Sequence, residues 1–307
     1  MKKYDPTASI TDIVDSIVFG PVTSRRGGRS LGINLLPPGK KFCSFDCAYC
    51  MLGKTQTHSG KEAWAGINSV EEGLLEASEF LQKTNMKIES IALTGNGEPT
   101  LNPEFPETIE RILEVRDNVF SDVPVVIYTN SSRVCENSVM NGLALGDVVV
   151  AKLDAVDDKL REIINRPSNT PPVKDIVAGL GALRECISGE LAVDIMLVEI
   201  DKETNLSCLE ELSEALREIQ PHRVYVQTPT KPLFETSVKS VANENIIKSA
   251  KFIREKTGYN VYVLLGMNPP MSIEILANWR GWLNGYERAR NSNHKSDKTV
   301  WRTQGSG

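Results

Sequence analysis

The segment Cys43-Ser44-Phe45-Asp46-Cys47-Ala48-Tyr49-Cys50 carries three thiols within eight residues. An apolar run from Ser30 to Leu36 precedes it, and the length and composition of that run predict a buried strand. Thiolates suit iron–sulfur clusters and zinc, and cysteines so close together on a short loop can surround a single centre. The sequence therefore predicts a metal centre on the loop that follows this strand.

On both sides of the cysteine loop, short apolar runs alternate with longer segments of helical period. This rhythm is typical of successive βα units, so we expect an α/β fold with a parallel sheet. Ligands gather at the carboxyl ends of such strands, which is where the loop lies. Strands are predicted at Ser30 to Leu36, Ile88 to Thr94, Val125 to Thr129, Asp147 to Leu153, Leu191 to Val198 and Arg223 to Gln227, with a candidate seventh at Val261 to Leu265.

The helices between these strands have recognisable ends. Ser69-Val70-Glu71-Glu72 matches a capping box that would open a helix, and Phe105 to Val115 is a second expected helix. A third, from Asn243 to Lys256, is expected to end at Gly258 because glycine readily adopts the left-handed conformation that closes a helix.

Composition places the chain among globular proteins of a reducing compartment. It has 307 residues, of which 40% are hydrophobic and 24% charged, and its six cysteines are too few for a secreted disulfide framework. No stretch approaches the roughly 20 apolar residues of a membrane span, and no leader is recognisable, so we expect a cytoplasmic protein.

Charge is unevenly distributed along the sequence. The net charge of -5 argues against a general nucleic-acid binder. Between Gly20 and Glu62, however, seven basic residues accompany two acidic ones, and from Trp279 to the end six accompany two. The first basic stretch flanks the cysteine loop, whereas the second is also compatible with a solvated, loose tail.

Three thiols favour one kind of metal centre over others. Ordinary electron-transfer clusters take four cysteines, and the remaining Cys135, Cys186 and Cys208 are isolated in predicted helices, where a cysteine is most often a small buried hydrophobe. A three-cysteine 4Fe-4S cluster would leave one iron open to bind a further molecule. The alternative is a structural zinc site with His58 as fourth ligand.

This cysteine spacing, with an aromatic residue just before the last thiol, resembles the signature of the radical S-adenosylmethionine (SAM) superfamily. The resemblance implies a partial (β/α)6 TIM-like barrel in which Cys43, Cys47 and Cys50 hold one 4Fe-4S cluster and Tyr49 lies near the adenine of SAM. It further implies reductive cleavage of SAM to methionine and a 5'-deoxyadenosyl radical, which abstracts hydrogen from a substrate. We expect residues 20–265 to form the barrel, residues 1–19 a short helix or strand covering its mouth, and residues 266–307 an extension whose last ~17 residues are disordered.

Three further segments are candidate cofactor contacts. Gly95-Asn96-Gly97-Glu98-Pro99 follows a predicted strand and resembles the superfamily's Gly-Gly-Glu-Pro segment with one position changed, so Glu98 is expected to meet the SAM amino group. Lys152 suits the SAM carboxylate, Asp154 the ribose hydroxyls, and Asn130 either of them. A plain turn at residues 95–99 and a mutual ion pair between Lys152 and Asp154 are the alternatives.

Arginines precede the first predicted strand. Arg25, Arg26 and Arg29 lie on a glycine-rich segment, where they are candidates for substrate contacts or for surface salt bridges. This segment resembles the subgroup that includes wyosine-forming transfer-RNA enzymes (4-demethylwyosine synthase-like). Those enzymes use a second cluster, and no second cysteine group is present before residue 43.

The partners follow from the expected reaction. We expect a small-molecule or peptide substrate, with transfer RNA as the alternative, and an electron donor such as flavodoxin or ferredoxin. A non-catalytic iron–sulfur or zinc scaffold is the alternative from a different functional class.

Overall fold

The fold is that of a computed structural model. It describes residues 1–9, 12–26, 28–55, 63–120, 123–201, 203–230, 235–266 and 270–272.

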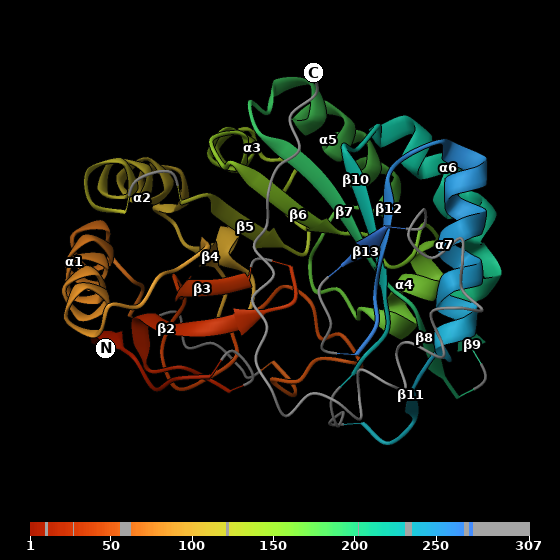
Figure 1. The fold of residues 1–307 in the computed structure, drawn as a ribbon. Coiled ribbons are helices and arrows are strands. Elements are labelled where there is room, and N and C mark those ends of the chain that lie inside the picture. The colour runs from red at the N-terminus through yellow and green to blue at the C-terminus, as the bar shows by residue number, and fades with distance from the viewer. Residues whose placement is uncertain are drawn as a thin grey trace.

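A curved sheet of ten strands forms the centre of the molecule, and its curvature opens toward one side (Figure 1). The strands lie side by side in the order β1 (Lys2–Asp5), β2 (Ser16–Ser24), β3 (Gly28–Ile33), β4 (Ser90–Leu93), β5 (Val125–Thr129), β6 (Val148–Lys152), β7 (Glu190–Met196), β10 (Arg223–Gln227), β12 (Val261–Leu264) and β13 (Met271–Ser272). Every neighbouring pair from β3 to β12 is parallel. The edge strands β1 and β13 do not pair with each other, so the barrel is partial, as expected for this α/β fold.

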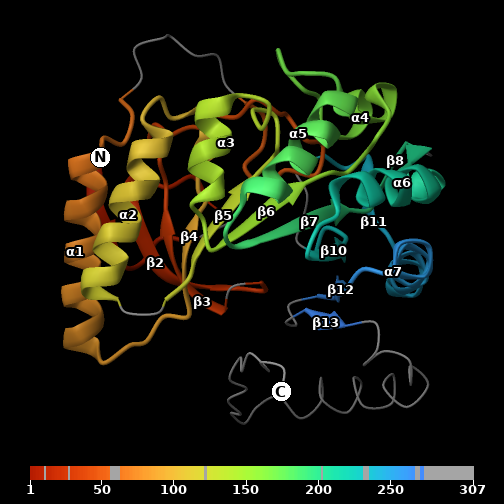
Figure 2. The ribbon, with the colours of Figure 1, turned by 90° about the horizontal axis from the view of Figure 1, so that it is seen from above.

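Helices cover the convex face of the sheet, as the view from above shows (Figure 2). They are α1 (Ile67–Thr84), α2 (Phe105–Val119), α3 (Asn137–Ala144), α5 (Val173–Cys186), α6 (Leu209–Ile219) and α7 (Asn243–Thr257), with 3-10 turns at Pro99–Leu101 and Asn205–Cys208. The short helix α4 (Asp158–Ile164) instead packs beside β8 (Val198–Ile200) and the cysteine loop. A second small sheet has the order β11 (Val238–Ser240), β8 (Val198–Ile200) and β9 (Glu203–Thr204).

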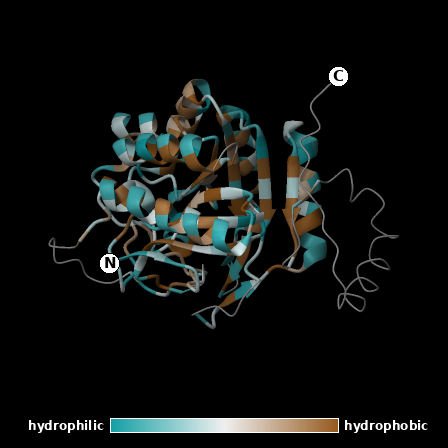
Figure 3. Ribbon diagram, turned by 60° about the vertical axis from the view of Figure 1, so that its left-hand side comes forward, coloured by the Kyte–Doolittle hydropathy of each residue, from teal (hydrophilic) through white to brown (hydrophobic). Residues whose placement is uncertain are grey.

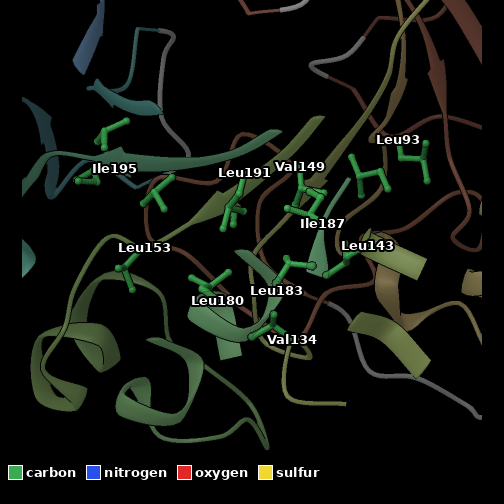
Figure 4. Packing of buried hydrophobic residues seen from close by; sticks show 14 of the residues in the cluster. Leu93, Val134, Leu143, Val149, Leu153, Leu180, Leu183, Ile187, Leu191 and Ile195 are labelled. Atoms are coloured by element: carbon green, nitrogen blue, oxygen red, sulfur yellow. The ribbon is translucent and has the colours of Figure 1, made fainter. Parts of the chain in front are cut away.

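Alternation along the strands separates two buried layers. Val149 and Ala151 of β6 pack in the large core beneath the helices, whereas Val150 lies in a smaller cluster with residues of β5, β7, β10 and β12. Figure 4 shows Leu180 and Leu183 of α5 packed beneath the strands in the large core. Coloured by hydropathy, the strands are largely brown and the helices carry teal outward faces (Figure 3). The second face of the sheet is thereby left to line the inside of the partial barrel.

The apolar runs predicted the strands well, whereas the capping motif did not predict the start of α1. The strands Val125–Thr129 and Arg223–Gln227 match their predicted bounds, and the candidate seventh strand is present as β12. The predicted capping box is wrong: α1 begins at Ile67, its N-cap is Gly66, and no side chain caps it. Gly258 closes α7 with a φ of 76°, as expected.

The described residues 1–9 and 12–24 contribute strands rather than a helix. β2 pairs antiparallel with β3, and β1 pairs parallel with β2, so both extend the edge of the main sheet. No helix in the part of the chain that the structure describes is both long and apolar enough to cross a membrane.

Candidate active site

The cysteine loop follows β3 and is attached to its surroundings at two points. On one side, the Phe42 amide donates to the Asn96 carbonyl oxygen at 2.8 Å, and the Glu98 amide donates to the Phe42 carbonyl oxygen at 3.2 Å. On the other side, the Ala48 amide donates to the Ile164 carbonyl oxygen at 2.9 Å. These backbone bonds hold the loop between the turn after β4 and the end of α4.

Gly97 allows the first of these attachments. Its φ of 147° lies in a region that L side chains rarely adopt, and a Cβ at this position would lie 2.0 Å from the Phe42 carbonyl oxygen. The same Cβ would lie 3.1 Å from the Cβ of Cys43. Any larger residue would therefore displace the loop and its first cysteine.

A cavity of about 280 Å³ lies beside the loop, on the concave side of the sheet. Its wall includes nine of the predicted site residues, namely Cys43, Cys47, Cys50, Tyr49, Gly95, Gly97, Glu98, Asn130 and Lys152, and also the predicted Arg26. Residues from the loop, from the turn after β4 and from the strand ends thus meet at one site, although they are far apart in sequence.

The three thiols fit a cluster better than a single ion. Among the residues that the structure describes, no three His, Cys, Asp or Glu side chains are grouped to hold one metal ion, whereas a structural zinc ion needs thiolates about 2.3 Å away. An iron–sulfur cluster is wider than one ion, and a cavity of about 280 Å³ that all three cysteines line has room for it. His58, the proposed fourth zinc ligand, lies outside the described residues.

Burial keeps two of these thiols protonated in the metal-free chain. Burial, and to a smaller extent the neighbouring Cys47, raises the pKa of the Cys43 thiol. Burial and then Asp154 raise the pKa of Cys47 to about 11. Iron would supply the positive charge that both thiolates lack, which is how metals bind buried cysteines.

Glu98 is held rigidly at the cavity wall. Glu98 is 1% exposed. Its carboxylate accepts hydrogen bonds from the Thr100 hydroxyl at 2.7 Å, from the Thr129 hydroxyl at 2.8 Å and from the backbone N–H of Asn130 at 2.6 Å. Burial raises the pKa of Glu98, and these hydrogen bonds oppose the shift. The turn is therefore more than a plain connection, because it places a fixed carboxylate beside the cysteines.

The two asparagines of the prediction lie in different places. Asn130 lines the cavity and donates to the Ser44 hydroxyl at 2.9 Å, next to Cys43. The Asn96 side chain is absent from the wall, is fully buried, and bonds the backbone of Val14 and Pro37 at 2.8 to 3.0 Å. These hydrogen bonds connect the turn after β4 to the backbone at Val14 and Pro37.

Lys152 and Asp154 form the ion pair that was the alternative to ligand binding. Lys152 Nζ lies 3.2 Å from Asp154 and 3.1 Å from Asp194, and although burial would lower the pKa of Lys152, these carboxylates raise it. Asp154 does not line the cavity: it accepts from the Tyr49 hydroxyl and, at 2.8 Å, from Asn165 Nδ2. Lys152 Nζ also lies 5.4 Å from the centre of the Tyr49 ring.

The three predicted arginines do not all lie at the cavity. Arg26 lines the cavity and pairs with Asp194 at 2.8 Å. Arg25 lies beside it and donates to Gln227 Oε1 at 2.6 Å. Arg29 is exposed and contacts the Lys87 carbonyl oxygen at 3.4 Å, outside the cavity wall. The turn between β2 and β3 therefore delivers two of the three guanidinium groups to β7 and β10.

Sequence reasoning missed several wall residues. Tyr128 on β5 and Gln227 on β10 were not singled out, although each lies at or beside the end of a predicted strand. A systematic search for polar side chains at those strand ends would have found both. Of the remaining cysteines, only Cys208 is buried; Cys135 and Cys186 are exposed, so the expectation of buried thiols is wrong for these two.

Known proteins resemble this chain over most of its length. The sequence model of the family described as "Radical SAM superfamily" matches residues 40–212. A UPF0026 protein of Methanocaldococcus jannaschii is 35% identical over 256 residues, which cover 82% of this chain and 75% of that protein.

Solved structures share the fold at low sequence identity. "TYW1 with a lysine-pyruvate adduct bound" aligns with a TM-score of 0.55 at 17% identity, over 77% of this chain and 76% of that one. A radical SAM methyltransferase from Sphaerobacter thermophilus aligns with a TM-score of 0.56 at 17% identity, over 76% of this chain and 65% of that one.

Proposed function

This chain belongs to the radical SAM superfamily and to the UPF0026 proteins, and we propose that it cleaves SAM reductively to methionine and a 5'-deoxyadenosyl radical that abstracts hydrogen from a substrate. Its family makes it an enzyme whose cofactors are a 4Fe-4S cluster and SAM. The scaffold alternative, without catalysis, is therefore not retained.

One observation carries the proposal. Cys43, Cys47 and Cys50 line a single cavity together with Glu98, Asn130 and Lys152. A ligand that coordinates an iron through an amine and a carboxylate needs an acceptor for its remaining N–H groups and a donor for its remaining oxygen. The fixed Glu98 carboxylate and the Lys152 ammonium supply these two groups.

Each part of the wall has a definite task in this proposal. Glu98 holds the ammonium of the methionine part. Gly95 and Gly97 let the turn that carries Glu98 pack closely against Asn34 and Phe42. Tyr49 presents its ring toward the adenine, with its hydroxyl fixed by Asp154. When bound at Cys43, Cys47 and Cys50, the cluster supplies the electron for SAM cleavage. The cavity wall positions the target and excludes water.

The substrate proposed for this site is a small molecule or a peptide, and the reductant is a flavodoxin or ferredoxin in the cytoplasm. A transfer-RNA substrate, proposed as the second candidate, is favoured by the fold shared with the TYW1 structure. It is disfavoured because the sequence has no second cysteine group before residue 43 and because the net charge is -5. The basic stretch from Trp279 onward lies outside the described residues.

Replacement of one cluster cysteine tests the proposal. We expect Cys47→Ala to lose the brown colour, most of the roughly four irons per chain and the release of 5'-deoxyadenosine under dithionite. The matched control is Cys208→Ala, because Cys208 is a buried thiol outside the cavity. Full iron content and SAM cleavage in Cys47→Ala, or a colourless wild-type protein with one zinc, would contradict the proposal.

A further inference from the structure

The segment that follows α4 runs antiparallel to the cysteine loop. Phe45 and Pro167 form an isolated antiparallel bridge, so two residues further along the loop Cys47 lies opposite Asn165. Opposite residues of an antiparallel pair have their side chains on the same side. Hydrogen bonds before and after Cys47 keep this register; they run from the Ser168 amide to the Ser44 carbonyl oxygen and from the Ala48 amide to the Ile164 carbonyl oxygen, each at 2.9 Å. The backbone therefore holds the Asn165 side chain beside that of Cys47.

The Asn165 side-chain amide contacts the Cys47 thiol. Asn165 Nδ2 lies 3.4 Å from Cys47 Sγ, a hydrogen-bond distance for an acceptor as large as sulfur. The same nitrogen lies 2.8 Å from Asp154 Oδ2 and 3.4 Å from the Tyr49 hydroxyl oxygen. Asn165 is 4% exposed. Its two N–H groups are therefore enclosed by three acceptors, one of which is a proposed ligand of the cluster.

Asp154 determines which end of the amide faces the thiol. Its carboxylate is paired with Lys152 at 3.2 Å and can only accept, so the nitrogen of Asn165 and not the oxygen must point toward it. One N–H of Asn165 is used in this bond. The other is left for Cys47 or Tyr49, and a thiolate is the stronger acceptor because it is charged. The register and Asp154, rather than the thiol itself, thus place this N–H.

Asn165 differs from the other side-chain donor near the cysteines. Asn130 Nδ2 lies 3.6 Å from Cys43 Sγ, but it is closer to the Ser44 hydroxyl, at 2.9 Å. Asn130 also lines the cavity, where it is a candidate contact of SAM, whereas Asn165 is not part of the cavity wall. The contact between Asn165 and Cys47 is therefore independent of SAM.

Hydrogen bonds to the thiolates of an iron–sulfur cluster change its reduction potential. Reduction adds one electron and breaks no bond, so the cluster and its thiolates gain one negative charge. A donor N–H stabilises the more negative form more strongly, because a hydrogen bond strengthens with the charge of its acceptor. A neutral N–H at Cys47 consequently raises the potential and makes it easier for the electron donor to reduce the cluster.

We propose that the Asn165 side-chain amide donates a hydrogen bond to the cluster-bound thiolate of Cys47 and thereby raises the reduction potential of the cluster. Asn165 acts through a ligand of the cluster and is therefore a positioning residue. This role rests on the proposed function in one respect, namely that Cys47 binds the cluster. It does not depend on the identity of the substrate.

A redox titration of the anaerobically reconstituted protein without SAM tests the role of Asn165. The electron paramagnetic resonance signal of the reduced cluster gives the midpoint potential. Asn165→Leu has a side chain of similar size without the N–H groups, and we expect reduction to become about tenfold less favourable, which lowers the potential of a one-electron couple by about 59 mV. Asn165→Ala removes the same N–H groups without a branched side chain, and its potential should shift in the same direction.

Asn205→Leu is the matched control. Asn205 is fully buried and also contacts Asp154, but its side-chain hydrogen bonds go to backbone atoms, at 2.8 to 3.0 Å; they are the carbonyl oxygens of Asp154 and Met196 and the amide of Val198. Its replacement loosens the same region without removing a donor from a cysteine. We expect the midpoint potential of Asn205→Leu to equal that of the wild type.

A second measurement detects the hydrogen bond itself. In protein labelled with 15N only at asparagine side chains, pulsed electron paramagnetic resonance of the reduced cluster should show coupling to a 15N nucleus. The coupling should persist in labelled Asn130→Ser, which leaves Asn165 as its source, and should be lost in Asn165→Leu. This measurement decides the question even if the Asn165 variants do not assemble the cluster.

The role of Asn165 is overturned if Asn165→Leu and Asn165→Ala keep the wild-type potential with their full iron content, or if Asn205→Leu shifts the potential as much. It is also overturned if labelled Asn130→Ser shows no coupling to 15N. A wild-type protein that holds no reducible cluster would contradict the proposed function instead. A wild-type cluster that cleaves SAM but has a potential insensitive to Asn165 would contradict only the role of Asn165.

Discussion

Asp194 joins three segments of the chain through its carboxylate. It accepts from Arg26 of the β2–β3 turn, from Lys152 of β6 and from Gln227 of β10, at 2.8 to 3.1 Å. Its side chain is 3% exposed. Burial alone would raise the pKa of Asp194, but Arg26 and Lys152 lower it to about 2. This carboxylate therefore stays ionised inside the barrel and joins Arg26, Lys152 and Gln227 at the cavity wall.

Replacement of Asp194 by asparagine measures its contribution at the residue scale. We expect Asp194→Asn to lower the free energy of unfolding at pH 7 by about 3 kcal/mol or more, because two buried cations lose their counter-charge. Urea unfolding monitored by circular dichroism gives this value. Asp117→Asn is the control, since Asp117 is 68% exposed and its loss is expected to change stability by less than about 0.5 kcal/mol. Equal stability of both variants would contradict the role given to Asp194.

The same carboxylate makes stability depend on pH. A folded-state pKa of about 2, below the ordinary 3.8, stabilises the protein above the ordinary value, and this stabilisation is lost as the pH falls toward 2. The difference corresponds to about 2 kcal/mol. We therefore expect the stability gap between wild type and Asp194→Asn to narrow from pH 5 to pH 3. A gap that is constant over this range would contradict the assignment.

Residue types and spacing predicted the cavity wall better than the contacts within it. The cysteines, Glu98 and Lys152 were identifiable because their types are chemically unusual at the ends of strands or on a glycine-rich turn. The hydrogen bond from Tyr49 to Asp154 was not identifiable. It joins residues 105 positions apart, and only the curvature of the sheet brings them together.

At the scale of elements, the cysteine loop depends on the turn after β4. Gly97 and Phe42 form an isolated parallel bridge, and no Cβ can be accommodated at Gly97. We expect Gly97→Ala to displace the loop and to reduce the iron retained after reconstitution severalfold, while the barrel stays folded. Iron analysis together with far-ultraviolet circular dichroism checks this outcome.

Gly258→Ala is the control for Gly97→Ala. Gly258 also has a positive φ, of 76°, but nothing lies within 4 Å of a Cβ built there. Its replacement is expected to cost about 1 kcal/mol at the end of α7, because alanine is disfavoured in the left-handed conformation, and to leave the iron content unchanged. If both variants retain the wild-type iron content, the turn after β4 does not position the cysteines.

The elements themselves were predictable where burial dictates the pattern. Strands that are buried on both faces appear as continuous apolar runs, such as Val148–Lys152 up to its terminal lysine. The edge strand Lys2–Asp5 has no apolar run, and pairing with β2 rather than composition makes it a strand. For α1, tertiary packing decided the first turn, and the helix begins before the serine that could have capped it.

At the scale of the whole molecule, the unpaired edges of the sheet leave the barrel open on one side (Figure 1). The helices that cover the convex face bury the large core, and the concave face is free to carry polar side chains. The turn between β2 and β3 connects with β7 and β10 through Arg26 and Arg25. An open barrel of this kind can enclose a cofactor and a substrate together, which is what radical transfer between them requires.

Product analysis of SAM cleavage tests the central claim most directly. Anaerobically reconstituted wild-type protein, incubated with SAM and dithionite, should release 5'-deoxyadenosine and methionine in equal amounts, as resolved by liquid chromatography and mass spectrometry. Omission of dithionite should abolish both products. Formation of S-adenosylhomocysteine or methylthioadenosine instead, or no cleavage by protein with its full iron content, would contradict the account.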